Sequence, residues 1–236
     1  MPASEDFSFS AQEFSGIARL FPLPNLVLFP HVMQPLHIFE PRYRELFREA
    51  LAGDRLIAMA LLAPGWEADY EGRPPLYPVA CLGRIAAHHR LADGSYNVLL
   101  SGLKRVEIVR ELPAAKAFRE AKVVVRDDFY PDVQAEIACQ LRRKFEAAFH
   151  KVVPTLLSSH EQMDSLVLET GVSLGVLTDI ISYMLDIPLA DKEALLAERD
   201  VHLRAEALLE HLTRAAADAS PGAAGAMDFP PVFSEN

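Results

Sequence analysis

The stretch Leu20–Arg48 constrains the fold more than any other part of the sequence, because prolines interrupt an otherwise apolar segment. Prolines at positions 22, 24, 30 and 35 stand among long apolar side chains. Proline fixes φ and has no backbone N–H, so a central strand is not expected to run through this region. The pattern leaves room for two short strands, Leu26–Phe29 and Gln34–Phe39, joined by a turn at Pro30-His31.

The pattern changes to helical periodicity at Pro41. Proline suits the first position of a helix, where its missing N–H has no partner to lose. We therefore predict a helix that ends near Ala52, before Gly53-Asp54. Apolar residues recur in it at spacings of three and four and predict one buried face, made by Tyr43, Leu46, Phe47 and Ala50.

The next segments favour strands. Apolar or alternating runs bounded by turn residues predict β-structure at Arg55–Leu62, Val79–Leu91, Tyr96–Leu112 and Phe118–Arg126, of which the second and third are long. Asp93-Gly94 separates two of these runs and favours the tight primed turn of a hairpin. Gly83 and Gly102 interrupt the same two runs, which predicts bulges or sharp bends.

The character of the sequence changes at residue 127. Pro131 is expected to open a helix carrying Leu141 and Phe145, with Pro154 interrupting it or starting a new turn. Three further helices are expected to follow Ser173, to run from about Ala190 to Leu196, and to begin near Asp200.

These elements predict an α+β fold in two parts. Residues 17–126 would form a partly closed, bent β-sheet or pseudo-barrel with one helix, and residues 127–214 a helical bundle. Residues 1–16 are predicted to be a flexible arm, held at the surface by Phe7, Phe9 and Phe14. Residues 215–236 are rich in Ala, Gly, Pro and Ser and are predicted to be a disordered tail.

Charge and cysteine content exclude several classes of function. Residues 1–126 carry 15 basic and 14 acidic residues, whereas residues 127–214 carry 8 and 16. An acidic protein without a basic block is not expected to bind nucleic acid. Cys81 and Cys139 stand far apart, the eight histidines are scattered, and no phosphate-binding loop is present, so we expect neither a metal nor a cofactor. With no leader and no apolar run near the roughly 18 residues of a membrane helix, we expect a cytoplasmic protein without a membrane partner.

The segment LFPLPNLVLFPHVMQPLHIFEPRYRELF closely resembles the opening of the Lon N-terminal (substrate-binding) domain family. The likeness is nearest to small bacterial proteins that carry this domain without the protease, and it extends over roughly residues 17–214. Two family patterns recur, matched here by Glu40–Tyr43 and Gly102–Arg105. We expect Glu40 to pair with an arginine of the second pattern, such as Arg105, and so to tie the first helix to the hairpin. The resemblance implies recognition of unfolded or tagged protein substrates and help in assembling a protease.

We therefore expect a non-enzymatic module that binds unfolded or flexible protein segments in an apolar, proline-shaped groove. It could act as an adaptor, with a protease or another protein as a possible partner, and its oligomeric state is open. Aromatic and methionine side chains give adaptable contact area. The candidate binding residues, drawn from the opening motif and from the loop at residues 63–76, are Phe29, Met33, His37, Glu40, Arg42, Trp66, Tyr70 and Tyr77.

Two of these candidate binding residues, and the helical part as a whole, have alternative interpretations. Trp66 could simply plug one end of a barrel, and His37 could be a core histidine with its hydrogen bonds satisfied. The acidic helical part could instead dock a partner protein, which would make the protein a structural assembly module.

A serine hydrolase is a further alternative. Gly171-Val172-Ser173-Leu174-Gly175 matches the Gly-x-Ser-x-Gly pattern of a nucleophile elbow, follows the apolar run Leu166–Leu168, and could use Asp191 with His202 or His211. The elbow requires a central parallel sheet, which the sequence does not predict. We therefore expect Ser173 to be the N-cap of the helix that follows it.

Overall fold

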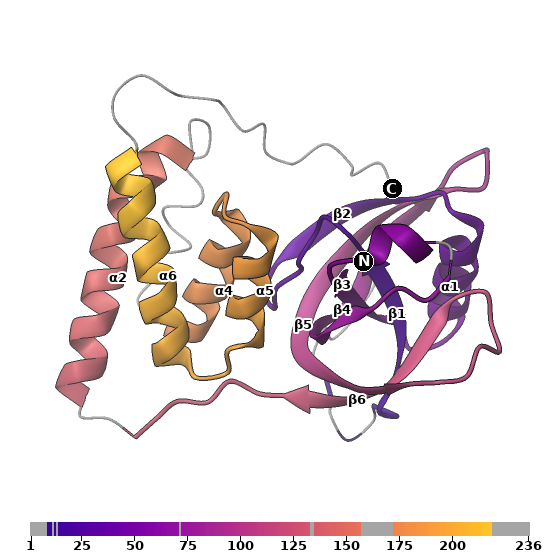
Figure 1. Ribbon diagram of the computed structural model, residues 1–236, viewed down its shortest axis with the longest axis horizontal. Helices are drawn as coiled ribbons and strands as arrows, with labels where there is room; N and C mark the ends of the chain where they lie inside the picture. Colours follow the sequence, from indigo (N-terminus) through magenta and orange to yellow (C-terminus); the bar gives the residue numbers. More distant parts are fainter. Residues whose placement is uncertain are drawn as a thin grey trace, which may run out of the picture.

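The computed structural model describes residues 9–10, 12, 14–70, 72–132, 135–156 and 172–218. A β-rich part with one helix lies beside a group of helices contributed by the later half of the sequence (Figure 1). Within that group α5 lies next to the strands and α2 lies farthest from them. The predicted α+β fold with two such parts is confirmed.

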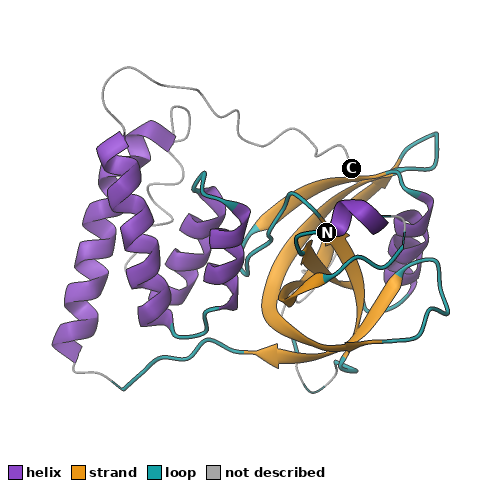
Figure 2. Ribbon diagram, viewed as in Figure 1, coloured by secondary structure: helices purple, strands orange, loops and turns teal. Residues whose placement is uncertain are grey.

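The strands form one mixed sheet that closes on itself (Figure 2). Hydrogen bonds run through β5, β4, β3, β1 and β6 and return to β5, while β2 pairs with β5 outside this ring. β1 is parallel to β3, and the other pairs are antiparallel. The strands are β1 (Ile17–Leu23), β2 (Met33–Ile38), β3 (Leu56–Leu62), β4 (Leu76–Arg90), β5 (Tyr96–Glu111) and β6 (Arg119–Arg126).

The prolines of the opening segment are placed differently from the prediction. Leu26–Phe29 is not a strand, whereas β1 runs through Pro22. β6 pairs with β1 only as far as Leu20, so Pro22 faces β3 on one side and has no ladder partner on the other. Pro35 lies in β2, which pairs with β5 alone. Both prolines therefore occupy strand positions where a missing N–H costs no ladder hydrogen bond.

The predicted turn at Pro30-His31 is present and rests on Gly102 of β5. The backbone N–H of His31 donates to the carbonyl of Gly102 over 2.9 Å, and the N–H of Gly102 donates to Val32 over 2.8 Å. A Cβ atom at Gly102 would overlap the carbonyl oxygen of Phe29. Only glycine lets the turn and the strand approach this closely.

The β4–β5 hairpin is confirmed, but its turn is wider than the predicted primed turn. A two-residue type I′ turn needs positive φ at both central residues. Here Asp93 has no positive φ, while Gly94 has a φ of 84°, and the backbone N–H of Leu91 donates to the carbonyl of Ser95 over 2.9 Å to close the turn. The register shifts where Gly83 pairs with Gly102, so the predicted bulge is also confirmed.

Two apolar cores result from this closure. A small core takes alternate residues from every strand of the ring, with alanines such as Ala58, Ala80 and Ala121 where the strands come close. The larger core covers the other face of the strands and continues into the helices, where it includes Phe145 and Leu208. Strand β3 is buried along its whole length because it contributes to both cores.

The helix α1 (Pro41–Ala52) has the predicted bounds and the predicted buried face of Tyr43, Leu46, Phe47 and Ala50. The helical part comprises α2 (Ala135–Leu156), α4 (Leu174–Met184), α5 (Leu189–Ala197) and α6 (Val201–Asp218). α2 passes through Pro154, so the predicted interruption there is wrong. The membrane-spanning criteria of length and apolarity are met by none of the described helices.

The two ends of the protein are described only in part. Phe9 and Phe14 pack against the smaller core with their ring centroids 5.8 Å apart, whereas Phe7 lies outside the described residues. Helix α6 continues to Asp218, so the predicted tail begins inside a helix. Residues 219–236 and the run Leu166–Leu168 also lie outside the described residues.

Candidate functional site

A loop between β3 and β4 forms one wall of a cleft. The loop is closed at its base, where the N–H of Ala63 donates to Pro75 over 2.8 Å. It contains the short 3-10 helix η1 (Trp66–Asp69). Loops of this length in compact domains often carry function, because they present side chains on a rigid scaffold.

One end of the loop is attached to the start of α1 by a cluster of Glu40, Arg42 and Tyr70. Arg42 donates from Nε to Glu40 over 2.9 Å and from Nη1 to the carbonyl of Tyr70 over 3.2 Å. The guanidinium lies 4.8 Å from the ring centroid of Tyr43 and 4.9 Å from that of Tyr70. The Tyr70 hydroxyl donates to Glu40 over 3.1 Å. Burial and the nearby Glu40 carboxylate raise the pKa of Tyr70, so this hydroxyl remains a donor.

The other end of the loop is held by β6. Arg119 donates from Nη1 to the carbonyl of Pro74 over 2.8 Å and from Nε to Glu111 over 2.8 Å. Arg73 donates from Nη1 to the carbonyl of Leu112 over 2.9 Å. The loop is therefore fixed on both sides of Gly72, and its wall is preorganised.

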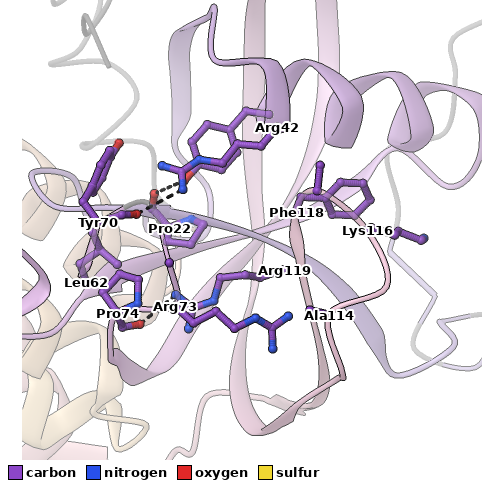
Figure 3. Close-up of a pocket in the computed structure, with 13 residues that line it drawn as sticks. Pro22, Arg42, Leu62, Tyr70, Arg73, Pro74, Ala114, Lys116, Phe118 and Arg119 are labelled. Atoms are coloured by element: carbon purple, nitrogen blue, oxygen red, sulfur yellow. Dashed lines mark hydrogen bonds between the residues drawn. The ribbon is translucent and has the colours of Figure 1, made fainter.

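The cleft between these attachments has a volume of about 270 Å³. Figure 3 shows Tyr70 and Arg42 on one side, Phe118 and Lys116 on the other, and Arg73 beside Arg119. The lining residues come from β1, α1, the end of β3, the β3–β4 loop, the β5–β6 connection and the start of β6: Pro22, Arg42, Tyr43, Leu62, Tyr70, Gly72, Arg73, Pro74, Ala114, Lys116, Ala117, Phe118 and Arg119.

Positive charge distinguishes the lining of this cleft. Four cations line it, Arg42, Arg73, Lys116 and Arg119, and none of the described residues that line it is a carboxylate. Their acidic partners lie behind them: Glu40 pairs with Arg42, Glu111 with Arg119 and Arg73, and Glu49 and Glu120 with Lys116. Apolar walls with a few placed polar groups are typical of binding sites.

Four of the predicted binding residues come together here. Glu40, Arg42 and Tyr70 form the cluster described above, and the Trp66 ring lies 5.6 Å from that of Tyr70. Trp66 is half-buried on η1 and belongs to neither apolar core, so it does not plug the barrel.

The other predicted residues lie elsewhere. Phe29 has no exposed surface and belongs to the larger core, so its prediction as a groove anchor is wrong. Tyr77 packs against the same core. Met33 is 43 % exposed on β2, and half-buried His37 hydrogen-bonds through Nδ1 to Asn97 over 2.8 Å.

The predicted pairing of Glu40 with Arg105 is wrong, because Arg105 points to the helical part. It bonds to the Asp179 carboxylate of α4 through both Nη atoms and donates from Nε to the carbonyl of Leu196 over 2.8 Å. It also contacts Asp128 over 3.2 Å. The pattern Gly102–Arg105 thus joins the opening turn to the helices.

Arg204 of α6 completes this buried network, which we name the junction network: Arg105, Asp128, Asp179 and Arg204. Arg204 donates to Asp128 over 2.9 and 3.0 Å and to Thr178 over 2.9 Å. The sequence carried no signal for these contacts, since the partners lie 23 to 76 positions apart. The same holds for Arg73, Lys116, Phe118 and Arg119 in the cleft, which meet only because β6 closes on β5.

Ser173 has the predicted capping role. Its Oγ accepts a hydrogen bond from the backbone N–H of Val176 over 3.3 Å at the start of α4. This contact satisfies one of the free N–H groups at the helix start.

Comparison with known families decides the assignment of the protein. Residues 17–214 match the family described as the ATP-dependent protease La (LON) substrate-binding domain. The chain belongs to the Lon substrate-binding domain family.

Its similar curated relatives are Lon proteases. The chain is 30 % identical to the Lon protease of Heliobacterium modesticaldum over 196 residues, which is 83 % of this chain and 23 % of that protein. It is 26 % identical to Lon protease 2 of Myxococcus xanthus over 206 residues, 86 % of this chain and 24 % of that protein. The chain therefore spans about a quarter of the length of these relatives.

Solved structures of Lon N-terminal domains share the fold. The N-terminal domain of the Mycobacterium avium complex Lon protease superposes with a TM-score of 0.63 at 17 % identity, covering 86 % of this chain and 100 % of that chain. The Lon N-terminal domain protein from Xanthomonas campestris superposes with a TM-score of 0.59 at 20 % identity, covering 82 % and 97 %.

Proposed function

We propose that this protein is a non-catalytic module that binds flexible segments of other polypeptides in the cleft between α1, the β3–β4 loop and the β5–β6 connection. The observation that carries the proposal is that Arg42 and Tyr70 line one fixed cleft, with Glu40 and Trp66 in contact with Tyr70, in a member of a substrate-binding family. A volume of about 270 Å³ suits one or two side chains of an extended segment.

Trp66 and Tyr70 are the expected anchors. Both are half-buried and stand next to the cleft, and tryptophan and tyrosine are enriched among residues whose truncation weakens binding most. Arg42 and Glu40 fix Tyr70 before a ligand arrives, and Trp66 packs against the Tyr70 ring, which lowers the ordering cost of binding.

The test is a fluorescence anisotropy titration of a labelled, chemically unfolded protein. We expect Trp66→Ala/Tyr70→Ala to weaken binding at least about tenfold, since hot-spot truncations cost more than about 1 kcal/mol each. The matched control is Phe129→Ala/Tyr130→Ala, which removes two aromatic side chains that are 52 % and 50 % exposed outside the cleft. Equal affinities for all three proteins, or equal losses in both variants, would contradict the proposal.

A second candidate is docking of a partner protein by the helical part. Phe129, Tyr130 and Leu203 are large apolar side chains that are at least half exposed, and the backbone of Phe129 bridges to Asp200 at the start of α6. Exposed apolar groups beside an acidic bundle fit a partner with a basic, partly apolar surface. In that case the Phe129/Tyr130 variant would lose the complex, the Trp66/Tyr70 variant would keep it, and salt would weaken it.

The proposal gives Ser173 no catalytic role. Ser173→Ala is expected to leave any hydrolysis of ester or peptide substrates at the level of the wild type. A specific loss of turnover in this variant, with the fold intact by circular dichroism, would support the hydrolase alternative instead.

A further inference from the structure

Arg73 and Arg119 share a single carboxylate at the cleft. Arg119 bonds to both oxygens of Glu111, and Arg73 lies 3.8 Å from Oε2 of the same carboxylate. Among the described residues no second carboxylate lies within ion-pair distance of either guanidinium. Within the described part of the chain, both guanidinium groups therefore share this one carboxylate, while the nearby carboxylate of Asp69 accepts from the backbone N–H of Arg73 over 3.1 Å.

The other cations near the cleft are better compensated. Arg42 has Glu40 to itself, and Lys116 lies 2.7 Å from Glu49 and 3.0 Å from Glu120. Among the residues that the structure describes, Arg73 is thus the cleft cation whose ion pair is longest, at 3.8 Å. Since the whole protein has a formal charge of −10, a cleft lined by four cations is a local feature that the average composition does not explain.

Arg73 is placed to receive a ligand. Its side chain is 37 % exposed, and its one hydrogen bond to a described residue uses Nη1. A guanidinium has five N–H donors in a planar fork, so the remaining donors of Arg73 match the two oxygens of a carboxylate. Arg119 is almost fully buried and fixed by Pro74 and Glu111, which gives the site a rigid base.

Apolar groups lie next to this pair. Pro74, Phe118 and Leu62 line the same cleft, but each of them is buried and exposes little surface to a ligand. A matching ligand would therefore be recognised mainly through its carboxylate. A polyanion such as nucleic acid fits less well, because the protein as a whole is acidic.

We propose that the side of the cleft formed by Arg73 and Arg119 binds a carboxylate of the captured polypeptide. The carboxylate comes either from an Asp or Glu side chain or from the C-terminus of that polypeptide. This proposal rests on the proposed function, because it assigns the chemistry of the segment that the cleft receives.

The test uses four fluorescent peptides with the same apolar sequence. One ends in a free carboxylate and one in an amide, and two further amide-ended peptides carry either Glu or Gln at an internal position. We expect one of the carboxylate peptides to bind about tenfold more tightly than its neutral match, as one added charged hydrogen bond gives. The peptide that shows the gain identifies the source, a side chain or the terminus.

Arg73→Gln is the decisive variant, since this exposed residue is replaceable without affecting the core. We expect it to abolish the preference for the carboxylate peptide. Arg143→Gln makes the same charge change on the exposed surface of α2, far from the cleft, and should keep the preference (Figure 1). The preference should also fall as salt is raised.

The failures of the two proposals differ. If all four peptides bind equally to the wild type and to Arg73→Gln, while Trp66→Ala/Tyr70→Ala weakens all of them, the carboxylate site is wrong and the cleft remains the binding site. If Arg143→Gln removes the preference as strongly as Arg73→Gln, only the net charge acts and the site is also wrong. If no peptide and no unfolded protein binds, both proposals fail.

Discussion

Two groups of arginines and carboxylates in this protein differ in how completely their charges are paired and in how deeply they are buried. The junction network sets Arg105 and Arg204 against Asp128 and Asp179, and three of these side chains are at most 3 % exposed. At the cleft, Arg73 and Arg119 share Glu111, and the Arg73 side chain is 37 % exposed. Buried ion pairs are tolerated when they are fully hydrogen-bonded, whereas an exposed guanidinium without a close carboxylate has donors left for a ligand. The comparison separates a group that holds the fold from one that is available for binding.

The largest expected effect comes from breaking the junction network. Arg105→Met leaves Asp179 buried beside Arg204 alone, at 3.6 Å, and also removes the bond to Leu196. We expect a loss of about 3–5 kcal/mol in the free energy of unfolding, measured by urea denaturation. Arg126→Met, which breaks an ion pair with more than a third of each side chain exposed, should cost less than about 1 kcal/mol. Equal losses would show that burial does not distinguish the two pairs.

A third ionisable group extends the comparison, because it is buried and has no hydrogen-bond partner within the described part of the chain. Glu193 of α5 is 3 % exposed, and neither carboxylate oxygen has a hydrogen-bond partner among the described residues. Burial raises its pKa to about 8 from the ordinary 4.5. Because the folded pKa is the higher one, this group makes the protein lose stability as the pH rises from about 4.5 to about 8.

Glu193→Gln should therefore stabilise the protein in alkali. At pH ~9 we expect a gain of about 1–3 kcal/mol in the free energy of unfolding, and at pH ~5 a much smaller difference, since the wild-type carboxyl is then neutral. Urea denaturation at both values of pH measures the change. A gain that is the same at both pH values would mean that the charge of Glu193 is not its cause.

Replacing both members of a buried pair should cost less than replacing one. In Arg105→Met/Asp179→Leu, Arg204 keeps Asp128, and the removed charges leave apolar groups in their place. We expect this double variant to lie within about 2 kcal/mol of the wild type, because an apolar substitute avoids desolvating either ion. A loss larger than that of Arg105→Met alone would indicate that the pair itself stabilises the fold.

The smallest expected effect is on the cleft. Arg73→Gln should change the free energy of unfolding by no more than about 0.5 kcal/mol, because exposed ion pairs contribute little. The same urea series measures it, beside the binding tests above. A loss above about 2 kcal/mol would place Arg73 among the residues that hold the fold, like Arg105.

Local sequence patterns predicted much of the architecture. The face of α1, the bounds of β3, the hairpin of β4 and β5, and the cap at Ser173 follow from spacing and turn chemistry within a few residues. The prediction placed a strand at Leu26–Phe29, where none is present, and excluded one at Pro22, through which β1 runs. The exclusion failed because proline prevents a ladder hydrogen bond only on the side where its N–H would point. Whether that side has a neighbour depends on strand order, which local patterns do not encode.

The candidate site was predictable only in part. Glu40, Arg42, Trp66 and Tyr70 stood out by type and by place in a long loop or at a helix start. Phe29 was misassigned, since an aromatic residue beside prolines has the same local pattern in a core as in a groove. Arg105 was assigned to Glu40, although its side chain reaches the helices instead.

By itself the sequence determined the α+β division, the proline-interrupted opening and the family resemblance, because periodicity, turn residues and a long motif act locally along the polypeptide. Only the tertiary structure decided which charges meet. The closure of β6 on β5 brings Arg119 and Lys116 to the loop of Arg73, and the packing of α4 and α6 brings Asp179 and Arg204 to Arg105. Ion pairs form between side chains that the fold makes adjacent, and that adjacency depends on contacts distant in sequence.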